Sequence, residues 1–121
     1  MKIQIMIDFI KGLLGINSNQ ITEEEVRALF KSGIKAELLD VRMMQEYRTE
    51  HINPCRNIDV KDKEFSKKVN YLDRDVTYVL YCRSGRRSQT ALKMMQKMGF
   101  REVYSLKGGV TTWIGPKKVT K

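Results

Sequence analysis

Short apolar runs alternate along this chain with segments in which apolar residues recur every three to four positions. Four runs have the length and composition of strands, at Glu37 to Val41, Arg56 to Val60, Val76 to Tyr81 and Glu102 to Leu106. The third is uncharged and rich in β-branched and aromatic residues, which is typical of a strand buried on both faces. Strands separated by helical or charged segments predict an α/β fold, with a mainly parallel central sheet and helices on both faces.

Helix signals lie between these strands. Thr22 and Glu25 form a capping-box pattern, and the apolar positions that follow predict a helix that ends at Gly33. After Val76 to Tyr81, a second helical pattern continues to Met98, and its methionine-rich stripe is expected to pack on the sheet. The stripe consists of Ala91, Leu92, Met94, Met95 and Met98.

The length of 121 residues suits one domain with a single core. We expect that domain over residues 20–116, preceded by an extension, residues 1–19, and followed by a basic tail, residues 117–121. The segment from Lys61 to Asp75 is mostly charged and predicts a surface crossover. Its expected anchors are Phe65, Val69, Tyr71 and Leu72.

The extension carries apolar residues at helical spacing, which predicts an amphipathic helix over Met1 to Leu14. Such a helix could pack on its own domain, lie on a membrane surface or pair with another subunit. The predicted apolar face consists of Ile3, Met6, Ile7, Ile10 and Leu14.

A strong positive charge limits the classes of partner. The chain has 23 Lys and Arg against 14 Asp and Glu, a net charge of +9, which attracts anions. The basic residues are scattered and no aromatic residues interleave with them, so the pattern favours a small anion over nucleic acid. No apolar run approaches the roughly eighteen residues of a membrane span. The oligomeric state stays open.

The chain has two cysteines, Cys55 and Cys82, and one histidine, His51. These are too few for a disulfide framework or a Cys/His zinc site, so we expect no metal and a reducing, cytoplasmic location. His51 precedes a proline and a short strand, which suits a histidine that ties a loop to the backbone. Cys55 is expected to be a small buried filler, or else to resolve an oxidised Cys82.

Cys82 stands where the strand Val76 to Tyr81 ends and the next helix begins. In open α/β sheets this edge binds ligands, and the free N–H groups of the following helix favour an anion. The same donors, together with nearby cations, lower a thiol's pKa from its ordinary value of about 8.5. The segment therefore predicts a reactive thiolate. Three arginines, Arg83, Arg86 and Arg87, supply the cations, and Gly85 permits a tight loop.

Asp40 lies near the carboxyl end of another predicted strand, Glu37 to Val41. If both strands are parallel, it shares a sheet edge with Cys82; otherwise it caps a loop or helix. A tyrosine-phosphatase type of loop needs an arginine six residues after its cysteine, but Ser88 occupies that position. The arginine stands at Arg87, so the loop is one residue too short for that chemistry.

Five segments, in order, make the chain resemble a single-domain rhodanese, a sulfurtransferase. The resemblance covers roughly Ile21 to Ile114. It departs where Glu50 replaces a glycine, where Asn53 to Arg56 replaces Pro-Gly-Ala, and in the extension before residue 20. The matching segments are D-V-R at Asp40 to Arg42, E-Y at Glu46 and Tyr47, H-I-N-P-C-R-N-I at His51 to Ile58, C-R-S-G-R-R-S at Cys82 to Ser88, and L-K-G-G-V-T-T-W at Leu106 to Trp113.

The resemblance implies a rhodanese-like fold and a thiosulfate sulfurtransferase-like enzyme. Cys82 would carry a sulfane sulfur from thiosulfate or a low-molecular-weight persulfide, a small anionic donor, to cyanide or a thiol, without a cofactor. Backbone N–H groups of the loop would hold the outer sulfur. The resemblance assigns substrate binding to Arg83, Ser84, Gly85, Arg86, Arg87 and Ser88, with Arg83, Arg86 or both on the donor and Arg87 paired with a carboxylate. It assigns support of the site to Asp40 and Arg42.

Two other functions fit the same residues. One is a sulfur-relay or persulfide-binding module that receives its sulfur from a partner protein. The other is a phosphatase or arsenate reductase on the same fold, which the short loop disfavours.

Overall fold

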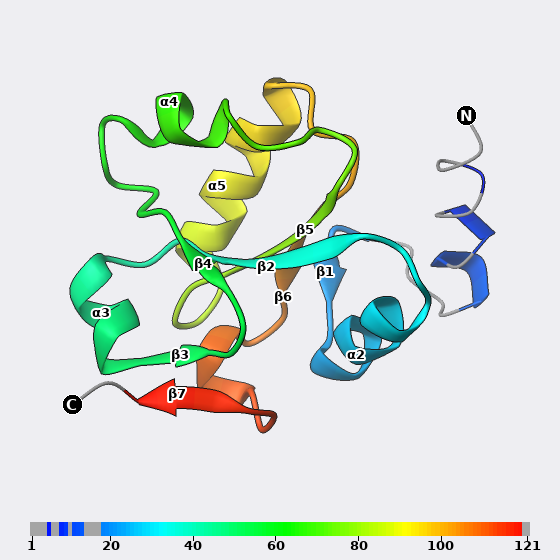
Figure 1. The fold of residues 1–121 in the computed structure, drawn as a ribbon, viewed down its shortest axis with the longest axis horizontal. Coiled ribbons are helices and arrows are strands. Elements are labelled where there is room, and N and C mark those ends of the chain that lie inside the picture. The colour runs from blue at the N-terminus through cyan, green and yellow to red at the C-terminus, as the bar shows by residue number, and fades with distance from the viewer. Residues whose placement is uncertain (1–4, 6–7, 10, 14–17, 120–121) are drawn as a thin grey trace.

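The computed structural model describes residues 5, 8–9, 11–13 and 18–119. Its centre is a five-stranded sheet in the order β1-β6-β5-β2-β4, in which every neighbouring pair is parallel (Figure 1). These strands are β1 (Gln20–Ile21), β2 (Ala36–Asp40), β4 (Arg56–Asn57), β5 (Thr77–Tyr81) and β6 (Val103–Leu106). The helices are α2 (Glu23–Lys31), α3 (Met44–Thr49), α4 (Phe65–Val69), α5 (Arg86–Lys97) and the 3₁₀ helix η1 (Gly109–Thr112).

Each face of the sheet has its own apolar core, which confirms the predicted α/β fold with helices on both faces. One core joins the sheet to α4 and α5, through residues such as Phe65, Leu92 and Met95. The other joins it to α2 and η1, through Val26, Leu29 and Val110. All five residues of β5 are buried, as its uncharged composition predicts.

The two main helices begin and pack as the sequence predicts. At the start of α2, the Thr22 hydroxyl accepts from the Glu25 N–H at 3.1 Å, and the Glu25 carboxylate accepts from the Thr22 N–H at 2.9 Å. In α5, Ala91, Leu92 and Met95 are buried, and the other two methionines of the stripe pack partly against the same core. The stripe is therefore core packing.

Short elements are where sequence and structure differ. β1 is formed by two residues next to the extension. An antiparallel pair joins β3 (Glu50–Ile52) to β7 (Lys117–Val119), and β7 occupies part of the predicted basic tail. The crossover anchors Phe65, Val69 and Leu72 are buried, but Tyr71 is 85% exposed. Two-residue and three-residue strands are set by tertiary pairing, since they are too short to show a period in the sequence.

Only part of the predicted N-terminal helix is described. Residues 5, 8–9 and 11–13 are helical, whereas the five residues of its predicted apolar face lie outside the described residues. Lys11 approaches Glu102 at 3.4 Å, while Ile5, Phe9 and Leu13 are 66–71% exposed. Across residues 5, 8–9, 11–13 and 18–119, we find no helix with the length and apolar character that a bilayer crossing needs.

Candidate active site

Cys82 lies directly after β5, at the carboxyl edge of the parallel sheet. β2 and β5 pair in register with Asp40 opposite Tyr81, so the predicted shared edge is confirmed. The cysteine is 1% exposed, and its sulfur accepts the Gly85 N–H at 3.0 Å. Gly85 has φ +123°, a conformation that favours glycine. The chain thus turns back over its own sulfur atom.

Hydrogen-bond donors around the sulfur lower the pKa of Cys82. Burial alone would raise this pKa, but the backbone N–H and the hydroxyl of Ser88, followed by the backbone N–H groups of Gly85 and Ser84, outweigh it. The leading donors are therefore amides and a hydroxyl from the start of α5 and its loop. The sequence predicted the N–H donors of the helix start together with the three arginines, without the Ser88 hydroxyl.

A buried pair of serines stands behind the sulfur. The Ser88 hydroxyl lies 3.7 Å from Cys82 Sγ and 2.7 Å from the Ser105 hydroxyl on β6. Ser88 also donates to the Gly85 carbonyl at 2.9 Å. Ser88 is the third residue of α5, whose N-cap is Gly85 with no side-chain cap bond, so an expectation that Ser88 caps the helix is wrong. Ser105 escaped sequence analysis. Its signal was a hydroxyl within the otherwise apolar end of a buried strand.

The lowered pKa predicts that alkylation by iodoacetamide distinguishes the two cysteines. Because Cys82 keeps its thiolate at pH values below the ordinary thiol range, its rate should stay high as pH falls through that range and decline only at lower pH. Burial raises the pKa of Cys55 to about 11, so Cys55 should stay unmodified at neutral pH. Peptide mass spectrometry against pH measures both, and faster labelling of Cys55 would contradict this assignment.

The segment after β6 holds the Cys82 loop in place through hydrogen bonds to its backbone carbonyls. The Val110 N–H donates to the Cys82 carbonyl at 3.0 Å, and the Thr111 hydroxyl donates to the Arg83 carbonyl at 2.7 Å. Gly109, with φ +59°, lies so close that a Cβ there would stand 2.5 Å from the Arg83 carbonyl oxygen and closer still to that of Cys82. This close approach explains why the second glycine of L-K-G-G-V-T-T-W, Gly109, has no side chain.

The three arginines of the loop have different surroundings. Arg87 makes a two-pronged ion pair with Glu46 of α3, at 2.6 and 3.0 Å, which confirms the predicted carboxylate partner. Glu46 also accepts the Met43 N–H at 3.1 Å, so the pair joins α3 to the start of α5. Arg83 and Arg86 are exposed, and within the described residues neither guanidinium has an ion-pair or hydrogen-bond partner. Arg83 and Arg86 are therefore available to an anion.

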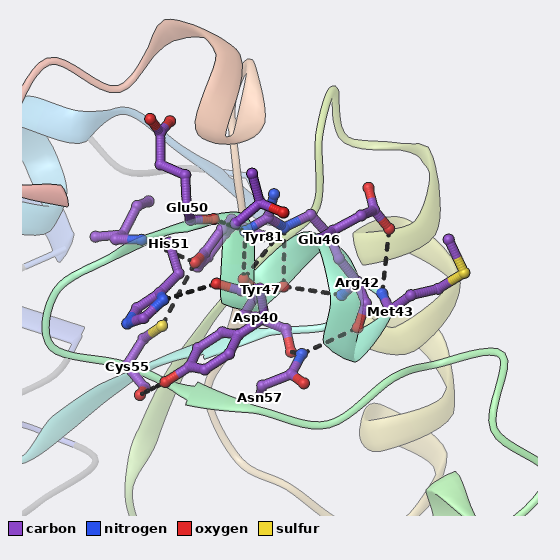
Figure 2. A network of polar contacts seen from close by, with 12 residues as sticks. Asp40, Arg42, Met43, Glu46, Tyr47, Glu50, His51, Cys55, Asn57 and Tyr81 are labelled. Carbon is purple, nitrogen blue, oxygen red and sulfur yellow. Dashed lines mark hydrogen bonds and ion pairs between the residues drawn. The ribbon is translucent and has the colours of Figure 1, made fainter. Parts of the chain in front are cut away.

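Asp40 and Arg42 lie on the opposite face of the sheet from Cys82. The guanidinium meets the buried carboxylate through Nε at 3.1 Å and Nη2 at 2.7 Å, and it stands 5.4 Å from the centre of the Tyr81 ring (Figure 2). Side chains alternate along a strand, so residues that accompany Tyr81 face away from Cys82. The structure therefore brings these two residues to the same edge as the loop but not to the sulfur.

Asp40 and Arg42 also make hydrogen bonds that connect the end of β2 to the neighbouring strands. Arg42 donates to the Glu50 carbonyl at 2.6 Å, and the side-chain amide of Asn57 donates to the carbonyls of Asp40 and Arg42 at 3.0 and 2.9 Å (Figure 2). Together these bonds connect β2, β3 and β4 beside the position of α3. Asn57 was not singled out from the sequence, because nothing in its neighbourhood distinguishes it from a surface asparagine.

The single histidine, His51, and the second cysteine, Cys55, make contacts within the fold. His51 Nδ1 lies 2.8 Å from the Tyr47 carbonyl, and the two rings stack at 3.8 Å, which confirms the predicted loop-tying histidine. Cys55 packs with Tyr81, its sulfur 3.4 Å from the phenol oxygen, on the face away from Cys82. This placement favours the filler over a resolving thiol. Across the described part of the chain, no group of three or more His, Cys, Asp or Glu residues could hold a metal ion.

Fold and site together define a small α/β protein with a buried cysteine, held in a loop of hydrogen-bond donors, at the edge of a parallel sheet. Residues 22–115 match the rhodanese-like domain, and the chain belongs to that family. It is 38% identical to the protein YqhL of Bacillus subtilis over 101 residues, which are 84% of this chain and 76% of that one. It is 34% identical to the thiosulfate sulfurtransferase GlpE of Pseudomonas aeruginosa over 94 residues, 78% of this chain and 82% of that one.

Longer relatives and a solved structure agree with this membership. The chain is 37% identical over 93 residues to the probable adenylyltransferase/sulfurtransferase MoeZ of Mycobacterium tuberculosis, matching 77% of this chain but only 24% of that protein. A rhodanese-related protein from Thermoplasma volcanium has the same fold, with a TM-score of 0.72 and 26% identity, covering 84% of this chain and 98% of that one. The mainly parallel sheet and its helices are thus those of a rhodanese-like domain.

Proposed function

We propose that the protein is a sulfurtransferase that carries a sulfane sulfur as a persulfide on Cys82. One observation supports this most: the Cys82 sulfur lies inside a loop that donates hydrogen bonds to it, and those donors lower its pKa. A thiolate is the reactive form of cysteine, so no separate general base is needed. The name of the relative GlpE supports thiosulfate as a donor for this chain.

In the first step, the Cys82 thiolate attacks the outer sulfur of thiosulfate. A bond forms between the two sulfur atoms, the bond to the sulfonate sulfur breaks, and its electron pair leaves with sulfite. Arg83, Arg86 or both bind the sulfonate and stabilise the departing sulfite, because both guanidinium groups are exposed and without a partner within the described residues. The backbone N–H groups of the loop, Ser84, Gly85 and Ser88 included, then hold the outer sulfur.

In the second step, cyanide or a thiol attacks the outer sulfur of the persulfide. The new bond forms to the acceptor, the sulfur–sulfur bond at Cys82 breaks, and the electron pair stays on Cys82 as a thiolate. Two ion pairs support the loop. One joins Arg87, at the start of α5, to Glu46, and the other joins Asp40 to Arg42 on the face of the sheet away from Cys82. Both cysteines are free, which suits a reducing compartment such as the cytoplasm.

Mass spectrometry of the intact protein and of its peptides tests whether Cys82 carries the transferred sulfur. After incubation with thiosulfate and removal of excess donor, we expect one added sulfur atom on Cys82 and none on Cys55, because only the Cys82 thiol has a lowered pKa. Addition of cyanide should remove that sulfur and release thiocyanate. Sulfur on Cys55 alone, or none on either cysteine, would contradict the proposal.

A sulfur-relay module fed by a partner protein is the second candidate. Two large apolar side chains, Met43 and Met44, are 46% and 55% exposed at the start of α3, the helix that carries Glu46, and a protein donor could cover them. A donor panel separates the two functions: thiosulfate, glutathione persulfide and the persulfide of a cysteine desulfurase, scored by the rate of Cys82 persulfide formation. Fast loading from the desulfurase alone supports the relay, and faster hydrolysis of an aryl phosphate than sulfur transfer supports a phosphatase.

A further inference from the structure

The two sides of β2 are covered by neighbouring strands to different extents. β5 pairs with β2 from Ala36 to Asp40, whereas β4 pairs only with Leu39 and Asp40. In Figure 1, β2 continues past β4 toward α2. Within the described residues, no strand therefore pairs with residues 36–38 on the side that faces β4. We call this stretch, residues 36–38, the free edge of β2.

The free edge presents backbone hydrogen-bonding groups to its surroundings. The Lys35 carbonyl accepts the Thr77 N–H of β5 at 3.0 Å. Because the backbone groups of successive strand residues point to opposite sides, those of Ala36 point away from β5, as does the N–H of Leu38. A row of such donors and acceptors on a strand fits the backbone of another extended chain.

A groove of about 640 Å³ lies along the free edge. All three residues of the free edge line it, together with Phe30 and Ile34, which precede β2, and residues 54–56, which lead into β4. Phe30 is 40% exposed, although its side chain is large and apolar. A purely apolar occupant would leave the backbone groups of the free edge without partners, which is unfavourable. The groove therefore suits an extended peptide with apolar side chains.

The charges of the groove favour an acidic peptide. Its charged lining residues are Lys35, Glu37 and Arg56. Glu37 and Arg56 form an ion pair at 3.2 Å, whereas the Lys35 ammonium has no ion-pair or hydrogen-bond partner within the described residues. The net charge of +9 adds a longer-range attraction for anions. Lys35 is thus available to an acidic side chain of the occupant.

We propose that the free edge of β2 is a docking site for an extended, acidic segment of a partner protein, which pairs with Ala36 and Leu38 as an added strand. Three residues at about 3.3 Å each span about 10 Å, so a segment of three or four residues covers the edge. Alternate side chains of the segment are apolar, because one of its faces meets Phe30 and Ile34. The apolar lining belongs to the core on the face away from Cys82, so this docking does not depend on sulfur transfer.

The test uses the peptide acetyl-Glu-Val-Thr-Val-Thr-Val-Glu-amide, which has alternate apolar residues and acidic ends. Amide chemical shifts and hydrogen exchange of the whole chain report its binding. We expect the N–H groups of Ala36 and Leu38 to exchange fast in the free protein and slowly with the peptide bound. The N–H of Glu37, which points to β5, should exchange slowly in both states. The same peptide with its interior amides N-methylated is the control, and it should bind roughly tenfold more weakly because it has lost the donors.

Ala36→Pro closes the free edge and leaves the pairing with β5 in place. Proline removes the N–H that points into the groove and puts its ring there, and edge positions tolerate it. We expect peptide binding to weaken by roughly tenfold, with urea unfolding as the check on the fold. Lys35→Gln should weaken binding by roughly threefold at low salt, as for loss of an exposed charge pair. Lys97→Gln, which removes the same charge at the end of α5, is the matched control and should bind the peptide normally.

Each other outcome contradicts a defined part of the proposal. Equal binding of the N-methylated peptide would rule out an added strand and assign the groove to an apolar small molecule. Unchanged exchange at Ala36 and Leu38 with the peptide in large excess would overturn docking at this edge. Self-association that Ala36→Pro abolishes would assign the edge to a second copy of the chain. An equal fall in Lys35→Gln and Lys97→Gln would disprove the acidic preference. The comparison of the two peptides uses the unaltered protein, so it decides the question even if Ala36→Pro unfolds.

Discussion

Cys82→Ser should lower thiosulfate:cyanide sulfur transfer by roughly a thousandfold or more, because the hydroxyl that replaces the thiol stays protonated and forms no persulfide. The fold should survive, since oxygen is smaller than sulfur and the Gly85 N–H that now contacts Sγ at 3.0 Å can donate to it. Thiocyanate release under saturating donor measures the activity, and urea unfolding verifies the fold. Activity close to that of the unaltered protein would disprove the assignment of Cys82.

Cys55→Ser is the matched control, because it makes the same substitution in the same chain. Cys55 lies on the other face of the sheet, where a hydroxyl can keep the contact with Tyr81 that the thiol makes at 3.4 Å. We expect its sulfur transfer to remain within about twofold of the unaltered protein, as for a residue away from the reacting atoms. A comparable loss in both variants would point to a shared structural effect.

Gly109→Ala should have the second largest effect, because the added methyl group would press on the backbone of the Cys82 loop itself. The added Cβ would stand 2.5 Å from the Arg83 carbonyl oxygen, and a backbone carbonyl cannot move aside as a flexible side chain can. Either the loop or η1 must shift, and the sulfur moves with the loop. A displacement of about 1 Å at a reacting group can cost on the order of a hundredfold in rate. The kcat/KM for thiosulfate measures this loss.

Gly33→Ala separates that clash from backbone strain. Gly33 also has positive φ, +90°, but a Cβ there would meet nothing within 4 Å, and it follows α2 rather than a strand's carboxyl end. Strain alone should cost about 1–2 kcal/mol of unfolding free energy at either glycine, with sulfur transfer unaffected in Gly33→Ala. Equal rates in the two variants would mean that contact between Gly109 and the loop does not position the sulfur.

Much of this protein could be predicted from local patterns. The buried run before Cys82, the capping box at Thr22 and the stripe ending at Met98 each have a period or a spacing that only one kind of element satisfies. The position of Cys82 at the strand end followed from the same run. The carboxylate partner of Arg87 was expected as a type of residue, but its identity, Glu46, was not.

The features of the site that sequence analysis missed depend on contacts between residues that are distant in the sequence. Ser105 contributes to the site because β6 lies beside β5 and its end lies beside the start of α5, a neighbourhood that no spacing within E-V-Y-S-L indicates. The sequence placed Asp40 on the same edge of the sheet as Cys82 if the two strands are parallel. The edge was correct, but strand alternation turns its carboxylate to the face of Tyr81.

The sequence by itself determined the class of fold, the order of its main elements and the position of Cys82 at the end of a buried strand, since each follows from short-range periodicity or from the ends of elements. Tertiary structure alone decided which groups surround the sulfur. Loop amides and Ser88 proved to be the leading donors that lower its pKa, and Gly109 holds the loop by close contact. The physical reason is that these contacts join separate strands and helices, and packing sets their distances.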